Sequence, residues 1–440
     1  MKKRKTNIFV LMSIFLIISS GQDIYAATAA YLESALLSEA VVLMDGETGQ
    51  VLYEKNMRRR MYPASITKVL TALVALERGQ PDGVITMSHD AVFSVEPGSS
   101  GIALDVGEQL TFEQAMYALA IMSANDAANG IAEYIGGTTE NFAALMNARA
   151  REAGARESNF VNAHGLPDED HYTTAYDMAR ITMAAARLPR FLEIFGTDYY
   201  EMPPTNMKDE ARYFWSTNAL LTGAEIYDGV VASKTGWTTA AGHTLVTVAR
   251  RGGGARKLIA VVMKSAMQTD KWADTRALLD FGFDQLKEVT FSAEEIFQGN
   301  YPVINADGSS SRVDLLAGGF SALIPIAATK GDIEITYDVA NAKATFSLKS
   351  ELRGLTPSLL LGEVALTLRP IQEEPPVPSE PAANENDGDY AAEPESGLGF
   401  ARFILLAVLV TIGLFASAIL VLFARSRAAA ARRRRRQRGF

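Results

Sequence analysis

An apolar helix that carries a serine and a lysine one turn apart constrains this chain more than any other feature. The segment PASITKVLTALVALE, residues 63–77, has proline in its first turn and stops near Gly79. Ser65 and Lys68 are three residues apart, so the helix places their side chains on one face. The amine either reaches water along its stem, with the serine as a cap, or lies buried beside the hydroxyl. The second arrangement makes a nucleophile and its base, since an uncharged lysine can take a serine proton.

Two further short motifs follow along the chain. SAN at 123–125 has the form S-x-N, and KTG at 234–236 follows the apolar run GVVAS. Each motif alone is weak, because S-x-N occurs a second time at 216–218, before ALLTG. We interpret that second copy as structural, with Asn218 holding a turn. The order and context of the three motifs therefore carry the prediction.

The second motif lies where one apolar helix ends and another begins. The turn between TFEQAMYALAIM and NDAANGIAEYIGG can project Ser123 and Asn125 together into a cleft. The alternative is ordinary capping of the second helix by Asn125 or Asp126.

The third motif fits the end of a strand that lines the same cleft. Lys234 and Thr235 can hold a carboxylate there by charge and hydrogen bonds, and Gly236 lets a substrate approach the backbone. Lys234 is also a cation that would disfavour the ammonium form of a buried Lys68. The alternative is a strand end with a solvated lysine.

Hairpins on both sides of a helical segment predict an α+β fold. AVVLMDGETGQVLYEK reads as one hairpin and GHTLVTVARRGGGARKLIAVVMKS as another. TFEQAMYALAIM opens with Thr111 and Gln114, spaced as a capping box, and WADTRALLDFGFDQLKEV reads as a closing helix. This order predicts an antiparallel sheet covered by helices over 35–290. Short strands broken by Gly, Asn and Asp predict a small all-β domain over 291–370.

The two ends of the chain predict export and membrane attachment. Residues 1–26 have the layout of a signal peptide, with cleavage after Ala26 or Ala29; an uncleaved anchor is the alternative. Residues 403–424 carry no charge and are long enough for a transmembrane helix, against the alternative of a buried core helix. The eight arginines of 425–440 place that tail in the cytoplasm.

The net charge of −9 hides a strong asymmetry, because that basic tail follows an acidic segment. Residues 371–399, rich in Pro, Glu, Asp and Ala, predict a disordered linker. The chain thus reads as a single-pass protein of the cell membrane with an extracytoplasmic catalytic domain. Arginine runs also suit nucleic acid, but beside a membrane span we expect topology and lipid contact, and no nucleic-acid partner. The chain has no cysteine, so disulfides cannot stabilise it.

With its three motifs in this order, the chain resembles the low-molecular-weight penicillin-binding proteins, which are serine-type D-alanyl-D-alanine carboxypeptidases. The resemblance spans roughly residues 35–370 and includes NFVNAHGLPDEDHYTTAYDMAR and DGVVASKTGWTTAAGHTLV. It implies a DD-peptidase/β-lactamase-like fold and removal of the terminal D-alanine from peptidoglycan stem peptides. It also implies β-lactam antibiotics as inhibitors and a role in cell-wall biosynthesis and remodelling. Ala124 departs from the glycine that many relatives have there.

The resemblance also implies a role for each motif residue. Ser65 is the nucleophile, Lys68 is its base, and Ser123 relays a proton toward the leaving D-alanine. The implied substrate-binding residues are Asn125, Lys234, Thr235, Gly236 and Trp237. Backbone N–H groups of Ser65 and Trp237 form the oxyanion hole. Lys271 is the candidate for a further basic residue near the substrate carboxylate.

Other hydrolase classes fit the sequence less well. A Ser-His-Asp hydrolase needs G-x-S-x-G, which is absent, although His164 and Asp168 are present. A zinc peptidase needs H-E-x-x-H, and we interpret His164 and His171 as loop structure near the cleft. A class A β-lactamase needs a glutamate for deacylation, and neither Glu157 nor Glu169 lies in an E-x-x-L-N setting. We expect no metal and no cofactor. A non-catalytic penicillin sensor or wall-binding scaffold would not need the serine–lysine pair.

Overall fold

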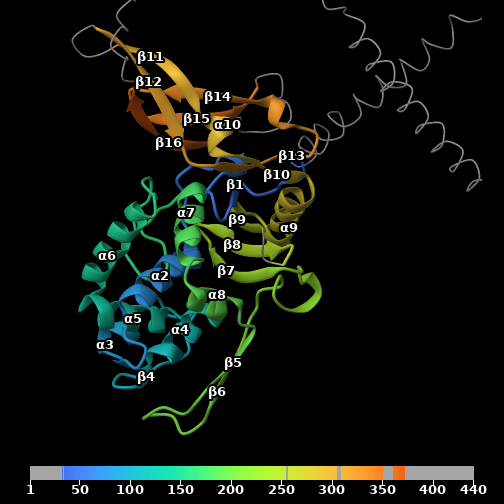
Figure 1. Ribbon diagram of the computed structural model, residues 1–440. Helices are drawn as coiled ribbons and strands as arrows, with labels where there is room; N and C mark the ends of the chain where they lie inside the picture. The colour runs from blue at the N-terminus through green and yellow to red at the C-terminus, as the bar shows by residue number, and fades with distance from the viewer. Residues whose placement is uncertain (1–31, 33, 254–255, 305–308, 350–359, 372–440) are drawn as a thin grey trace, which may run out of the picture. The chain divides into compact units, whose positions relative to one another are not determined.

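The computed structural model describes residues 32, 34–253, 256–304, 309–349 and 360–371 (Figure 1). The predicted signal peptide, transmembrane helix and basic tail, and nearly all of the predicted linker, lie outside these residues. Within the described part of the chain, no helix combines the length and apolarity needed to cross a membrane.

A five-stranded antiparallel sheet lies at the centre of the catalytic region, in the order β2-β1-β9-β8-β7. Its strands are β1 (Ala40–Asp45), β2 (Val51–Lys55), β7 (Val230–Thr238), β8 (Gly242–Arg251) and β9 (Arg256–Ser265). Both predicted hairpins, β1-β2 and β8-β9, are confirmed. Pairing of β1 with β9 joins the start of the region to its end, so the helical segment is an insertion within one sheet.

Alternation along β1 explains how the sheet separates two apolar cores. Val42 and Met44 belong to a core formed with the inserted helices, whereas Val41 and Leu43 belong to one formed with α9 (Gln268–Asp284). Successive side chains of a strand point to opposite faces of the sheet. Because both faces are covered, every residue of β1 is buried, and its sequence is apolar almost throughout.

The inserted segment is mainly helical. Its α-helices are α2 (Lys68–Arg78), α3 (His89–Phe93), α4 (Phe112–Ile121), α5 (Asn125–Gly136), α6 (Thr139–Glu152), α7 (Ala175–Ala185) and α8 (Pro189–Gly196). The predicted capping box is confirmed, because the side chains of Thr111 and Gln114 each accept the other's backbone N–H. The helix predicted over 63–77 begins as a 3₁₀ turn, Ala64–Thr67, which continues into α2.

Two short hairpins complete this region. β3 (Val84–Thr86) pairs with β4 (Gln109–Thr111), and β5 (Tyr199–Met202) pairs with β6 (Arg212–Trp215). The β5–β6 hairpin follows α8 and runs out past the helices in Figure 1. It was not predicted.

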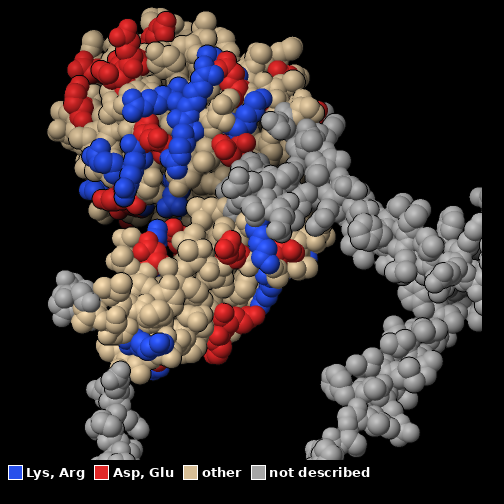
Figure 2. Space-filling model, turned by 90° about the horizontal axis from the view of Figure 1, so that it is seen from above, with Lys and Arg blue, Asp and Glu red and all other residues tan. Residues whose placement is uncertain are grey.

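From β10 onward the described chain is almost entirely β-structure, and its strands after β10 lie where the small all-β domain was predicted. β10 (Leu286–Phe291) pairs with β13 (Phe320–Pro325), and the short α10 (Ala293–Ile296) follows β10. β10 itself begins within the segment predicted as a closing helix, because α9 ends at Asp284 and the chain then pairs with β13. A second sheet, in the order β11-β12-β16-β15-β14, contains β11 (Gln298–Ile304), β12 (Ser310–Ala317), β14 (Ile333–Asp338), β15 (Lys343–Leu348) and β16 (Leu360–Pro370). On the face shown in Figure 2, Lys and Arg side chains form a band with Asp and Glu among them. Charges of both signs are therefore mixed on this face.

Candidate active site

The serine and lysine of the first motif face each other at the start of α2. Ser65 lies in the 3₁₀ turn, and Lys68 is the first residue of the helix. The Lys68 Nζ lies 3.0 Å from the Ser65 Oγ, which is hydrogen-bonding distance. Lys68 is completely buried, so the alternative in which its amine reaches water is wrong.

Two other contacts hold the Lys68 amine in place. Its Nζ donates to Asn125 Oδ1 at 2.7 Å and to the backbone oxygen of His164 at 2.8 Å. As an ammonium, the group also donates its third N–H to Ser65 Oγ. Burial, and then the charge of Lys234, hold the pKa of Lys68 well below its usual range. This lowered pKa favours the neutral amine, whose lone pair can accept the Ser65 proton.

Asn125 reaches the lysine instead of capping its own helix. It is the first residue of α5, and the preceding residue, Ala124, makes no side-chain cap. Asp126 is also used elsewhere, because its carboxylate accepts the backbone N–H groups of Ile102 and Leu104 at 3.1 and 3.2 Å. The capping alternative is therefore wrong for Asn125. Asp126 also accepts the backbone N–H of Ala127 at 2.9 Å, in the first turn of α5, so it both caps this turn and holds a neighbouring loop.

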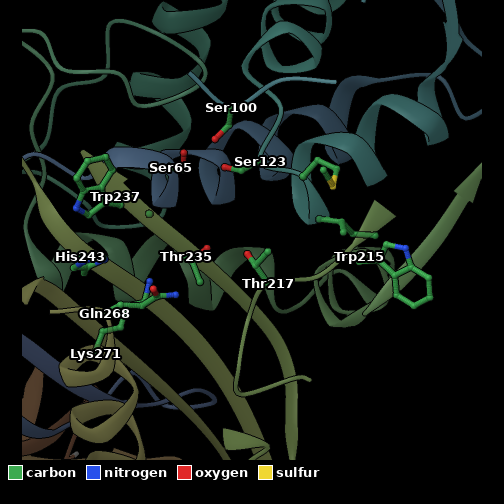
Figure 3. Close-up of a pocket in the computed structure, with 13 residues that line it drawn as sticks. Ser65, Ser100, Ser123, Trp215, Thr217, Thr235, Trp237, His243, Gln268 and Lys271 are labelled. Carbon is green, nitrogen blue, oxygen red and sulfur yellow. The ribbon is translucent and has the colours of Figure 1, made fainter. Parts of the chain in front are cut away.

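Ser123 turns its hydroxyl into the same space as Ser65. It has a φ of 55°, in the left-handed region that non-glycine residues seldom adopt. Its Oγ is buried, and within the described residues no group forms a hydrogen bond with it. Figure 3 shows this hydroxyl directed toward Ser65. A strained backbone and an unpaired buried hydroxyl both cost stability, and such features concentrate at functional sites.

The K-T-G motif lies on β7, directly beside the serine turn. Lys234 is buried, and its Nζ donates to the backbone oxygen of Thr235 at 3.1 Å. Burial, followed by the charge of Lys271, lowers the pKa of Lys234 to about 7. A side chain on Gly236 would come within 2.9 Å of the Ser65 backbone nitrogen. The structure thus explains in a second way why glycine occupies position 236. Besides letting a substrate approach, it allows β7 to lie against the turn that carries Ser65.

A pocket of about 370 Å³ opens between the serine turn, the Ser123 turn and β7 (Figure 3). The predicted residues in its wall are Ser65, Ser123, Thr235, Gly236, Trp237 and Lys271. Lys68, Asn125 and Lys234 do not line it, because they are buried behind this wall. Sequence reasoning missed the other lining residues, which are Ser100, Ile121, Met122, Trp215, Thr217, His243 and Gln268.

Thr217 shows how the missed residues escaped detection. It belongs to the second S-x-N copy, where Asn218 does hold a turn, because its Oδ1 accepts the N–H of Leu220 at 3.1 Å. Thr217 itself lies beside Thr235 in Figure 3 and lines the pocket. The second S-x-N motif, interpreted as structural, therefore also contributes Thr217 to the pocket wall. No short sequence pattern identifies Thr217 as a pocket residue.

Lys271 adds a cation to the pocket wall. It projects from α9, and burial lowers its pKa to about 8. No carboxylate contributes to the pKa shifts of Lys234 and Lys271, which arise from burial and from the charge of Lys271 on Lys234. Two buried amines without an acidic partner, Lys271 in the pocket wall and Lys234 behind it, favour an anionic ligand, such as a carboxylate.

The H-G-L segment forms the wall behind Lys68. Gly165 has a φ of 91° and lies so close to the Ala64 carbonyl that no side chain would fit. His171 Nε2 lies 2.9 Å from Thr67 Oγ1, and its Nδ1 accepts a backbone N–H at 3.2 Å. Burial lowers the pKa of His164 to about 3 and that of His171 to about 4, so both rings are neutral at pH 7. These histidines serve as structure near the cleft, as interpreted from the sequence.

These contacts define a class of enzyme. A serine hydroxyl hydrogen-bonded to a buried amine with a lowered pKa can attack a carbonyl and form an acyl-enzyme. A second free hydroxyl beside it can move a proton, and the buried cations can hold a carboxylate of the substrate. The site is that of a serine acyl-transfer enzyme.

Comparisons with known proteins agree with this class. The model of peptidase family S11, D-alanyl-D-alanine carboxypeptidase, matches residues 26–267. The chain is 31% identical over 326 residues to the D-alanyl-D-alanine carboxypeptidase DacF of Bacillus subtilis, covering 73% of this chain and 78% of DacF. The chain therefore belongs to the S11 family of D-alanyl-D-alanine carboxypeptidases.

Solved structures show the same fold. Penicillin binding protein 5 from Haemophilus influenzae matches with a TM-score of 0.59 at 25% identity, over 76% of this chain and 97% of that one. A mutant of the Streptomyces K15 DD-transpeptidase matches with a TM-score of 0.53 at 27% identity, over 56% of this chain and 98% of that one. The second match covers a smaller share of this chain, so the two neighbours differ in how much of it they resemble.

Proposed function

We propose that this enzyme removes the terminal D-alanine of peptidoglycan pentapeptides through an ester on Ser65, with Lys68 as the base. The observation that carries the proposal is the set of contacts around Lys68. The Lys68 Nζ lies 3.0 Å from Ser65 Oγ and is held by two carbonyl oxygens, and burial lowers its pKa, which favours the neutral amine that can take the serine proton.

In the acylation step, Ser65 Oγ attacks the carbonyl carbon of the D-Ala-D-Ala bond while Lys68 takes the hydroxyl proton. The tetrahedral intermediate collapses, the C–N bond breaks, and the leaving amine receives that proton through Ser123. The unpaired Ser123 hydroxyl supports this route, because a relay must accept one proton and donate another. Water then attacks the ester and gives a proton to Lys68, which returns it to Ser65 as the acid leaves.

The negative oxygen of the intermediate needs donors that are already in place. The backbone N–H groups of Ser65 and Trp237 would supply them. The close approach of Gly236 to the Ser65 nitrogen supports this assignment, since it brings the end of β7 against the serine turn.

Lys234, Thr235 and Lys271 would hold the carboxylate of the substrate. Thr235 and Lys271 line the pocket, and Lys234 is buried next to Thr235. Asn125 would orient the peptide with its amide N–H groups, because its Oδ1 is already bound to Lys68. The pocket wall thus offers the Thr235 hydroxyl and the Lys271 amine to the carboxylate, and Lys234 and Asn125 lie buried directly behind this wall.

The same attack would open a β-lactam ring and leave Ser65 acylated. A class A β-lactamase would then need a carboxylate to activate water. Glu157 is paired with Arg58 at 2.8 Å, Glu169 is exposed, and neither lines the pocket. This supports slow release of penicillin, as in an inhibited peptidase.

We further propose that residues 403–424 anchor the enzyme in the cell membrane after removal of the signal peptide 1–26. The uncharged run and the arginines that follow it support this orientation, with the catalytic domain outside the cell. Protease treatment of intact spheroplasts tests it: we expect loss of the catalytic region and survival of a fragment containing the tail. A catalytic region protected from protease in intact cells would contradict the proposal.

The activity itself is tested with the detergent-solubilised chain and a muropeptide pentapeptide. Free D-alanine should appear with wild-type protein and not with Ser65→Ala, while a fluorescent penicillin should label only the wild type. Unfolding curves of both proteins control for folding. D-alanine release by the Ser65→Ala variant would refute the assigned nucleophile, and rapid turnover of penicillin would indicate a β-lactamase.

A further inference from the structure

The β5–β6 hairpin presents an aromatic face to solvent beside the active-site pocket. Tyr199 pairs with Trp215 and Glu201 with Tyr213, so these four side chains share one face of the hairpin. Trp215 is 64% exposed, Tyr213 56% and Tyr199 37%. The rings of Tyr199 and Trp215 lie 4.3 Å apart. We call these four residues the hairpin face; adjacent exposed rings, unlike scattered ones, indicate a binding surface.

The opposite side of the hairpin fixes it to the body of the enzyme. Met202 and Phe214 are buried in the apolar core. The ring of Tyr200 stacks on Tyr117 at 4.1 Å, and Arg212 forms a 2.8 Å ion pair with the buried carboxylate of Glu108. The hairpin face is therefore held in place before any ligand arrives, which reduces the entropy lost on binding.

The hairpin face is continuous with the pocket. Trp215 belongs to both, and Thr217, two residues further along the chain, also lines the pocket. Figure 3 shows Trp215 at one end of the pocket and Trp237 at the other, with Thr235 between them. A substrate larger than a peptide end would therefore meet these rings as it leaves the pocket.

We propose that the hairpin face binds sugar rings of the glycan strands that carry the stem peptides. This rests on the proposed function, since the sugars are part of the same substrate. The C–H faces of a saccharide stack on aromatic rings, and its hydroxyls can donate to the Glu201 carboxylate. A second copy of this chain fits less well. The partly exposed rings offer on the order of 300 Å², against about 800 Å² per partner in a stable interface.

The test compares two substrates on the detergent-solubilised full chain. One is a sugar-free pentapeptide, and the other is a glycan strand that carries pentapeptide stems. In the variant with both Tyr199→Ala and Tyr213→Ala, KM for the strand should rise roughly 5- to 100-fold, from the loss of two stacking contacts. Hydrolysis of the sugar-free peptide should not change. Phe93→Ala, which removes an even more exposed ring (65%) from α3, should affect neither substrate.

Direct binding gives a second measurement that does not depend on activity. Glycan strands stripped of their stems should retain wild-type protein and release the double variant at lower saccharide concentration. If the double variant does not fold, the single variant Tyr213→Ala, which leaves the Tyr199–Trp215 contact intact, replaces it in both measurements. Equal binding by variant and wild type would overturn the inference. So would an equal loss of activity on both substrates, or a change of oligomeric state. Failure of wild-type protein to release D-alanine from the sugar-free peptide would instead count against the proposed function.

Discussion

Lysines in two regions of this molecule have opposite surroundings. In the catalytic region three of them are buried near the pocket and have no ion pair among the described residues: Lys68, Lys234 and Lys271. In the small β region lysines lie at the surface in ion pairs, such as Lys330 with Glu295 at 2.7 Å and Lys343 with Glu363 at 2.9 Å.

The pKa shifts follow from this difference. Glu363 raises the pKa of Lys343, whereas burial lowers the pKa of each catalytic lysine. A buried amine without a carboxylate destabilises the folded protein, because its charged form is poorly solvated. In the proposed mechanism, the same lack of solvation favours a neutral base at Lys68 and leaves Lys234 and Lys271 free to bind the substrate carboxylate. The catalytic region thus gains reactivity at some expense of stability, and the small β region does not.

The largest effect is expected when the same substitution is made in both regions. Lys68→Ala should lower kcat by about 10²–10⁴-fold, because the serine loses its base, and should slow acylation by penicillin similarly. Lys330→Ala should leave both rates unchanged. Steady-state D-alanine release and penicillin labelling measure these rates. A Lys68→Ala enzyme within tenfold of wild type would place the base elsewhere.

Lys234→Gln tests whether the buried cations act on the substrate and on each other. KM for the pentapeptide should rise about 10–100-fold, the loss expected for a charge-assisted hydrogen bond. Because the charge of Lys234 lowers the pKa of Lys68, its removal should shift the acid limb of the pH–kcat profile to higher pH. Lys330→Gln is the matched control. An unmoved acid limb would show that Lys234 does not influence the base.

The buried histidines should make the catalytic region sensitive to acid. The pKa of His171 is about 4 in the folded protein and about 6.5 when unfolded, so below pH 6.5 the unfolded chain binds the additional proton. The stability from this neutral ring is therefore lost as pH falls, by roughly 3 kcal/mol between pH 6.5 and pH 4. Urea unfolding of wild type and His171→Gln at both pH values measures it. Equal pH dependence in the two proteins would contradict the assignment.

The smallest effect is expected from a surface ion pair of the small β region. Lys343→Ala should leave the urea midpoint unchanged within experimental error, because exposed ion pairs contribute little and are screened by salt. The same urea titration of both proteins in high salt is the matched measurement, because salt screens the ion pair. A loss of stability comparable to that of the acidified histidines would mean that such pairs hold this region together.

The reacting groups could be predicted because they lie close together in the sequence. The other pocket residues could not, because they come from distant parts of the chain. Ser65 and Lys68 are one turn apart, so a helix alone brings them together. Trp215 and Gln268 come from segments without a recognisable motif, and only the packing of the β5–β6 hairpin and α9 brings them to the pocket. The fold class could be predicted because its hairpins and helices each show a clear hydrophobic period. The β5–β6 hairpin could not be predicted, because its inner face is defined by contacts with distant helices.

From the sequence by itself, the order of the three motifs determined the chemical class, since each motif places its reactive groups within a few residues. Only the tertiary structure decided that Lys68 is buried and that its pKa is lowered, as the proposed base requires. Its Nζ donates to partners 57 and 96 residues away in the chain. Solvation and hydrogen-bond geometry depend on atoms brought together by the whole fold, and no local pattern contains them.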